Sequence, residues 1–259
     1  MRMYGLFGKS ARTLLLPALL AGIFGVPLMA AAATDGTPAP KSADTAPSDA
    51  DLASTKCAIG EERFLPSDYF YCLATQSYGE QHYSYAQKFF LDAASWGSKP
   101  AQYVLGIMAL DGDHQPVNRP LALAWLTLAA ERPQSSFKQV YQSAYTSATA
   151  GERQAAESLL AKLRPTYADA TAAVRAEKRY AQGMAQLARM NAGESNYCME
   201  GIMPIDSAPD PQQCLPMQTM VNAIDKQAAI VFDGWSGHVS VGALQQVTTP
   251  ATNPPHPVK

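Results

Sequence analysis

The sequence lacks the motifs that mark common nucleotide-dependent and metal-dependent enzymes. Its 259 residues contain no P-loop, no dinucleotide-binding G-x-G-x-x-G and no zinc-binding H-E-x-x-H. Histidine is scarce, with four residues scattered along the chain. Because no group of His, Asp, Glu, Ser or Cys makes a credible catalytic site, we expect a protein that is not an enzyme and that binds no cofactor or metal.

The nearest approach to a catalytic motif is the segment from Gly234 to His238, which reads GWSGH. A nucleophile elbow requires G-x-S-x-G at a strand-to-helix turn, and here His238 occupies the place of the last glycine. We interpret the segment as a glycine-rich turn between a helix and a strand. A hydrolase using Ser236 is the least favoured alternative.

Charge of either sign is also sparse, and the balance is slightly acidic. The whole chain has 20 Lys and Arg against 22 Asp and Glu, a formal charge of −2. Nucleic acids and anionic membranes select basic surfaces, so we expect neither as a partner. Apart from the N-terminal segment, no hydrophobic run approaches the length that spans a bilayer.

The N-terminal segment predicts export. Arg2, Lys9 and Arg12 form a positive n-region, an apolar stretch follows over 13–29, and residues 31–33 offer an Ala-x-Ala cleavage site. We interpret residues 1–33 as a cleaved signal peptide of a periplasmic or secreted protein, without membrane insertion after cleavage. An uncleaved membrane anchor is the alternative.

Four cysteines in an exported chain indicate disulfides, because oxidising compartments preserve them. They permit three connectivities, of which we prefer Cys57 with Cys72 and Cys198 with Cys214, since each pair closes a short loop. A zinc site is disfavoured because the chain has no C-x-x-C and few histidines.

Low-complexity segments frame the folded part. Residues 34–55 are rich in Ala, Pro, Ser, Thr and Asp and predict a disordered linker, and the proline-dense residues 248–259 predict a disordered tail. Between them we place a helical domain at 56–165 and a C-terminal extension at 166–247.

A repeat organises the helical domain. The segment YAQKFFLDAASWG at 85–97 aligns with LALAWLTLAAERP at 121–133, an offset of 36 residues. Preceding helices align at an offset of 33, Phe70 with Tyr103 and Gly79 with Gly112. Self-similarity at this period is typical of stacked helix pairs. The spacing predicts helices near 66–79, 84–96, 100–110 and 119–131.

The second pair resembles a Sel-one-like repeat, a relative of the tetratricopeptide repeat. The positions that carry the resemblance are Ala101, Leu105, Gly106, Gly112, Ala122, Trp125, Ala129 and Ala130. It is convincing over 83–131, whereas the first helix of the first pair is degenerate. The resemblance implies a mainly α, short α/α solenoid and an adaptor role in assembly or signalling complexes.

Later segments lose the repeat pattern. We interpret predicted helices at 137–148 and 151–163 as a pair that caps the repeats. Pro165 is expected to end this segment, and a long alanine-rich helix is predicted at 167–190. Apolar residues at spacings of three and four predict a helix over 217–232. Alternating residues at 238–244 predict a short strand, which pairs with 201–205 or with a partner's sheet edge.

Aromatic residues crowd the repeat, and Tyr and Trp often supply interface energy. We expect most to fill the core and a few to line a groove, with Tyr71, Tyr78, Tyr103 and the polar Gln102 as the candidates. The predicted function is a scaffold in the cell envelope that binds a protein or peptide. Binding of a cell-wall glycan or stem peptide is the alternative, and the oligomeric state stays open.

Overall fold

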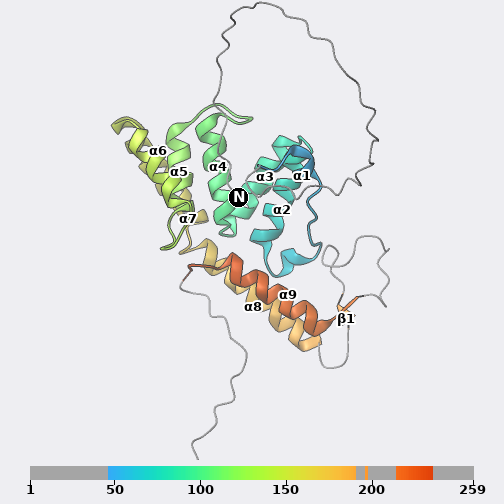
Figure 1. Cartoon of the computed structure of the whole chain (residues 1–259). Coiled ribbons are helices and arrows are strands. Elements are labelled where there is room, and N and C mark those ends of the chain that lie inside the picture. Colours follow the sequence, from blue (N-terminus) through green and yellow to red (C-terminus); the bar gives the residue numbers. More distant parts are fainter. Residues whose placement is uncertain (1–45, 191–195, 198–213, 236–259) are drawn as a thin grey trace, which may run out of the picture. The chain divides into compact units, whose positions relative to one another are not determined.

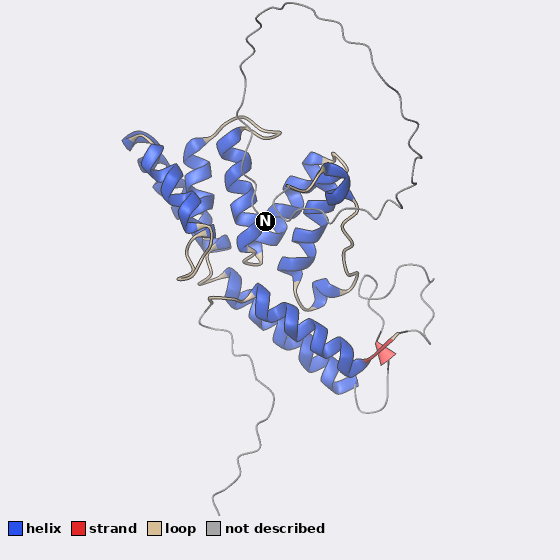
Figure 2. Ribbon diagram, viewed as in Figure 1, coloured by secondary structure: helices blue, strands red, loops and turns tan. Residues whose placement is uncertain are grey.

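The computed structural model describes residues 46–190, 196–197 and 214–235. This part of the chain is mainly helical, as predicted, and from Asp49 onward it belongs to one compact unit. Figures 1 and 2 show its helices. The elements in chain order are α1 Asp49–Ala53, η1 Glu61–Arg63, α2 Pro66–Gly79, α3 Tyr83–Ser95, α4 Lys99–Asp111, α5 Arg119–Ala129, α6 Lys138–Ser147, α7 Ala150–Tyr167, α8 Ala172–Met190, β1 Asn196–Tyr197, β2 Leu215–Pro216 and α9 Met217–Val231.

Helices α2 to α5 form two pairs whose limits match the predicted repeat. The first helices begin at Pro66 and Lys99, 33 residues apart, and the second helices at Tyr83 and Arg119, 36 apart. Local chemistry sets the limits in the second pair. The Ser98 hydroxyl accepts a hydrogen bond from the Ala101 amide at the start of α4, and Gly112 ends this helix with φ +76°.

Alanines let the helices of each pair approach closely. Ala86, Ala93, Ala94, Ala101, Ala122 and Ala129 are all fully buried in the core. At Gly106 a Cβ atom would lie 2.8 Å from Leu126 Cγ, so α4 contacts α5 with no room for a side chain. Trp125 fills the space toward α7, where its ring meets Tyr167 edge to face at 4.8 Å.

Helices α6 and α7 follow near the positions predicted for a capping pair, and α7 packs on α5. A capping box starts α7, because Thr149 and Glu152 exchange side-chain to backbone hydrogen bonds. The prediction that Pro165 ends this segment is wrong, since α7 continues to Tyr167. Proline removes one hydrogen bond near the helix end, and the packing of Tyr167 on Trp125 holds the last turn in place. The next helix, α8, therefore begins at Ala172 and not at Tyr167.

Helices α8 and α9 pack along each other, as Figure 1 shows, and share a core with Phe64 and Leu65. The predicted apolar stripe of α9 is confirmed, with Met217, Met220, Ile224, Ala228 and Phe232 buried. A Cβ at Gly183 of α8 would lie 2.5 Å from the Phe64 ring, so this glycine permits the contact.

The short strands β1 and β2 pair antiparallel ahead of α9, with Asn196 opposite Pro216 and Tyr197 opposite Leu215. They were not predicted. The strand expected at 238–244 and its expected partner at 201–205 lie outside the described residues, as do the signal peptide at 1–33 and the tail at 248–259.

Cys57 and Cys72 form the predicted disulfide, with their Cα atoms 5.6 Å apart. Cys214 is also disulfide-bonded, and its expected partner Cys198 lies outside the described residues.

The predicted linker at 34–55 is wrong for its last part, because Asp49–Ala53 forms helix α1. This helix packs on the end of α2, where a Cβ at Gly79 would lie 2.5 Å from the Asp49 carbonyl oxygen.

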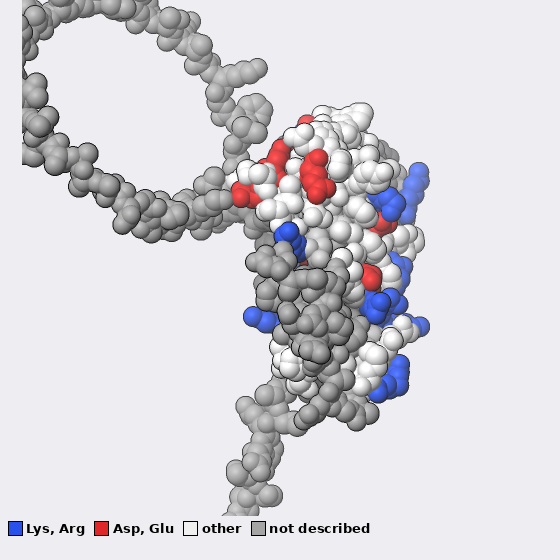
Figure 3. Space-filling view, turned by 90° about the vertical axis from the view of Figure 1, so that its right-hand side faces the viewer, with Lys and Arg blue, Asp and Glu red and all other residues white. Residues whose placement is uncertain are grey.

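Of the described helices, none is both long and apolar enough to cross a membrane. On the face shown in Figure 3, acidic residues gather near one end and basic residues lie along one edge, so neither sign covers it.

Candidate functional site

The four residues expected to line one groove lie in different surroundings. Gln102 is fully buried: its amide nitrogen donates to the Tyr167 carbonyl at 2.7 Å, and its oxygen accepts from Lys99 at 3.1 Å. Its assignment to a partner groove is therefore wrong, because no partner can reach it. Tyr103 stacks on Phe137 at 4.7 Å and belongs to a separate apolar cluster with α6.

Tyr78 takes part in a contact between the two inter-helix loops. Its hydroxyl donates to Asp113 at 2.8 Å, and His114 stacks on Tyr83 beside it. Burial, followed by this bond to a carboxylate, raises the pKa of the Tyr78 hydroxyl. Gln81 and His114, which occupy equivalent loop positions, both have a left-handed backbone, with φ +64° and +50°. Tyr78 thus joins the loops of the two pairs.

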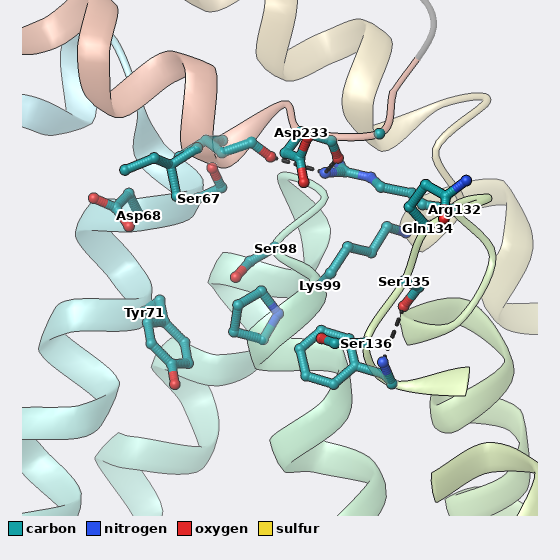
Figure 4. Close-up of a pocket in the computed structure, with 15 residues that line it drawn as sticks. Ser67, Asp68, Tyr71, Ser98, Lys99, Arg132, Gln134, Ser135, Ser136 and Asp233 are labelled. Atoms are coloured by element: carbon teal, nitrogen blue, oxygen red, sulfur yellow. Dashed lines mark hydrogen bonds between the residues drawn. The ribbon is translucent and has the colours of Figure 1, made fainter. Parts of the chain in front are cut away.

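Tyr71 lines a cavity of about 330 Å³, which Figure 4 shows in close-up. The cavity lies where the first turns of α2 and α4 face the loop between α5 and α6 and the end of α9. Its lining comprises Ser67, Asp68, Tyr71, Ser98, Lys99, Pro100, Arg132, Gln134, Ser135, Ser136, Phe137, Ile230, Val231, Asp233 and Gly234. The first helices of both pairs therefore contribute to one site.

Lys99, in the first turn of α4, is 6% exposed although it carries a charge. Its ammonium donates to the Leu128 carbonyl at 3.0 Å, lies 3.0 Å from an Asp169 oxygen and contacts the Glu131 carboxylate. In Figure 4 its side chain runs toward Arg132. An ammonium has three donor hydrogens, so the protein's own acceptors occupy this one.

Arg132, 8% exposed, completes a charge network that is buried apart from Glu131, whose side chain is 25% exposed. Its Nε donates to Asp169 at 2.9 Å, and its Nη1 donates to the backbone carbonyls of Val231 and Asp233 at 2.9 and 2.8 Å. Two cations, Lys99 and Arg132, face two anions, Glu131 and Asp169. The network is neutral, and it joins α4, the end of α5, the segment between α7 and α8, and the end of α9.

Asp68 belongs to a second polar group, at the start of α2. Gln227 of α9 donates to its carboxylate at 2.8 Å. Burial, together with the nearby Asp68 charge, raises the pKa of Glu61 from 4.5 to about 8, and the protonated Glu61 donates to Asp68. Burial also raises the pKa of Asp68, and the hydrogen bonds from Gln227 and Glu61 oppose that rise. Burial and this contact therefore favour a proton on Glu61 at neutral pH.

Ser67 precedes Asp68 in the cavity wall and is 2% exposed. Its hydroxyl has no hydrogen-bond partner among the described residues. A buried polar group left unpaired costs about 1–3 kcal/mol. Such an atom marks a place where a bound group would gain a hydrogen bond.

The cavity can accept and donate hydrogen bonds beside aromatic surface. Hydroxyls come from Ser98, Ser135 and Ser136, and rings from Tyr71 and Phe137. In the part of the chain that the structure describes, no cluster of three or more His, Cys, Asp or Glu could hold a metal ion. Ser236 and His238 lie outside it.

The sequence predicted Tyr71 as a groove residue, but it did not predict the charged residues around the cavity. One signal was present: Glu131 and Arg132 align, at the offset of 36, with Ser95 and Trp96 of the first unit. The second helix pair thus carries charged residues at two positions where the first pair carries uncharged ones, and this difference indicates that the two pairs are not equivalent.

No protein-family model, no curated protein and no solved structure matches the chain.

Proposed function

We propose that this protein is an exported scaffold of Sel-like helical repeats that binds a segment of a partner protein in the cavity between α2, α4 and the end of α9. The proposal assigns binding and no catalytic step. The cavity supports the proposal, because its wall joins the first helices of both pairs and contains the buried Ser67 hydroxyl, which has no hydrogen-bond partner among the residues that the structure describes.

The packing of the repeat positions supports a short solenoid. Leu105, Gly106, Ala122 and Trp125 are buried between the helices, where the family pattern places packing residues. Stacked helix pairs bury a continuous core and leave surface for a ligand. The Cys57–Cys72 disulfide supports export, because oxidising compartments preserve such bonds.

A photo-crosslinking amino acid at Ser136 tests the proposal in living cells. Ser136 is exposed and lines the cavity, so the probe would contact a bound segment without disturbing the core. Glu157, exposed on α7 outside the cavity lining, is the matched control position. We expect a discrete adduct with an envelope protein from Ser136 and none from Glu157. Absence of an adduct, or the same adduct from both positions, contradicts the proposal.

A cell-wall glycan is the second candidate, because two rings, Tyr71 and Phe137, lie in a cavity that also holds serine hydroxyls. Sedimentation with purified cell wall separates the two functions. Retention of the protein, lost in a Tyr71→Ala variant and combined with no protein adduct at Ser136, favours the glycan.

A further inference from the structure

The charges in the cavity wall indicate the chemistry of the group that fits it. Four charged residues line it: Asp68, Lys99, Arg132 and Asp233. The two cations are matched by Glu131 and Asp169 in the neutral buried network. Asp68 and Asp233 are the acidic residues of the lining outside this network, and Asp68 also accepts a hydrogen bond from Gln227, so the lining offers carboxyl groups and no cation beyond the network.

An anionic ligand is disfavoured by the same contacts. The positive ends of α2 and α4 face the cavity, but Asp68 lies in the first turn of α2 and the Ser98 hydroxyl caps α4. The ammonium of Lys99 already faces protein oxygens at Gln102, Leu128 and Asp169. An incoming carboxylate or phosphate would meet two carboxylates and no unmatched cation in the lining.

Apolar surface lies next to these carboxylates. The rings of Tyr71 and Phe137 and the side chain of Ile230 line the same cavity, and Ile230 is 63% exposed. A lysine side chain has an aliphatic stem and a charged tip. Its ammonium offers three donors and no acceptor, which suits a carboxylate together with the Ser67 hydroxyl, for which the described part of the chain supplies no partner.

The size of the cavity also favours a single side chain as the ligand. The cavity of about 330 Å³ lies at the small end of the range of ligand sites, about 300–1,000 Å³. It suits one long side chain better than several sugar units.

We propose that the cavity binds a primary ammonium group on an aliphatic chain, the side chain of a lysine in the partner segment. The stem contacts Tyr71, Phe137 and Ile230, and the ammonium binds Asp68 and the Ser67 hydroxyl, with Asp233 adding attraction. This inference rests on the proposed function and specifies the chemistry that the same site recognises.

Two probes that share a four-carbon side chain test it on the intact, oxidised protein without any substitution. Nα-acetyl-lysine amide and Nα-acetyl-norleucine amide differ in the terminal ammonium, and backbone amide chemical shifts report where each binds. We expect saturable shifts at Asp68, Ser98 and Ser136 with the lysine probe and binding at least about tenfold weaker with norleucine, as expected for the loss of a charge-assisted contact. Equal binding of the two probes, or shifts confined to residues outside the cavity, overturns the inference.

A variant provides the second measurement. Asp68→Asn should weaken the lysine probe by about tenfold and leave the norleucine probe unchanged, because only the ammonium interacts with the charge. Glu157→Gln on α7 is the control and should change neither. An Asp68→Asn protein that binds the lysine probe like the wild type overturns the inference.

The two proposals can fail separately. Cross-linked protein at Ser136, together with equal affinity for both probes, would overturn the lysine inference and support the scaffold function. Absence of adducts at Ser136 would overturn the function itself, whatever the probes show.

Discussion

At the scale of the residue, the burial of Glu61 beside Asp68 is the feature with the clearest consequence. Both carboxyl groups lie between η1, α2 and α9, and Gln227 donates to Asp68 from α9. The charged neighbours that raise the pKa of Glu61 are Asp68 and Glu62. Two carboxylates this close cannot both ionise without cost, so Glu61 keeps its proton near neutral pH.

Stability should therefore fall as the pH rises toward 8. The pKa of Glu61 is about 8 in the folded protein against an ordinary 4.5, so folding is favoured by proton binding. This contribution is complete below about pH 4.5 and is lost as the pH rises through 8. Glu61→Gln keeps a hydrogen-bond donor for Asp68 without a titrating group. Urea unfolding at pH 5, 6.5 and 8 should show a flatter pH dependence in the variant, with Glu157→Gln behaving like the wild type.

Parallel pH profiles for the wild type and Glu61→Gln would show that Glu61 ionises normally. In that case Glu61 would hold no proton at neutral pH, and Asp68 would face a full negative charge.

At the level of single helices, the sequence predicts the structure best. Helix limits depend on residues close together in the chain, such as the Ser98 cap and Gly112 in α4, and these can be read directly. The predicted helix limits are wrong at Pro165 and at α1. Tyr167 packs on Trp125 at the end of α7, and Gly79 of α2 lies against α1. Local patterns do not encode those contacts.

The contact of α4 with α5 provides a test of the repeat packing. Gly106→Ala would place a Cβ 2.8 Å from Leu126 Cγ, and Leu126 is fully buried and cannot move aside. Alanine normally favours a helix over glycine by about 0.5–1 kcal/mol, but overpacking costs about 1–3 kcal/mol. We expect a net loss of about 1–2 kcal/mol in the free energy of unfolding, measured with denaturant.

Gly151→Ala is the matched control, because nothing lies within 4 Å of a Cβ at this position in α7. It should leave stability unchanged or raise it slightly. If both alanine variants are equally stable, α4 and α5 are not packed as described.

At the scale of the whole molecule, the buried charge network connects parts that the sequence separates widely. Arg132 reaches Asp169, 37 residues away, and Val231, 99 residues away. Its neighbour Lys99 holds the start of α4 against the end of α5. The cavity wall depends on this arrangement, because both cations line it.

Removing one cation should destabilise the protein. Lys99→Met removes the ammonium from Asp169, which keeps Arg132, and from the partly exposed Glu131, so we expect a loss of about 1–3 kcal/mol in the free energy of unfolding. Lys88→Met, which breaks the exposed pair with Asp92 on α3, should cost less than about 0.5 kcal/mol. Thermal unfolding of the two variants measures the difference. Similar losses for both would show that Lys99 is solvated.

The helical class, the helix pairs at offsets of 33 and 36, the apolar stripe of α9 and the preferred Cys57–Cys72 pairing can all be predicted from the amino-acid sequence. These features follow from periodicity, capping residues and short spacing, which are local properties of a chain. The burial of Gln102, the internal pairing of Lys99 and Arg132 and the place of Asp68 in a cavity wall depend instead on the fold as a whole. The reason is physical: a charged residue favours water unless partners from distant segments compensate it, and a linear pattern does not say where those partners meet.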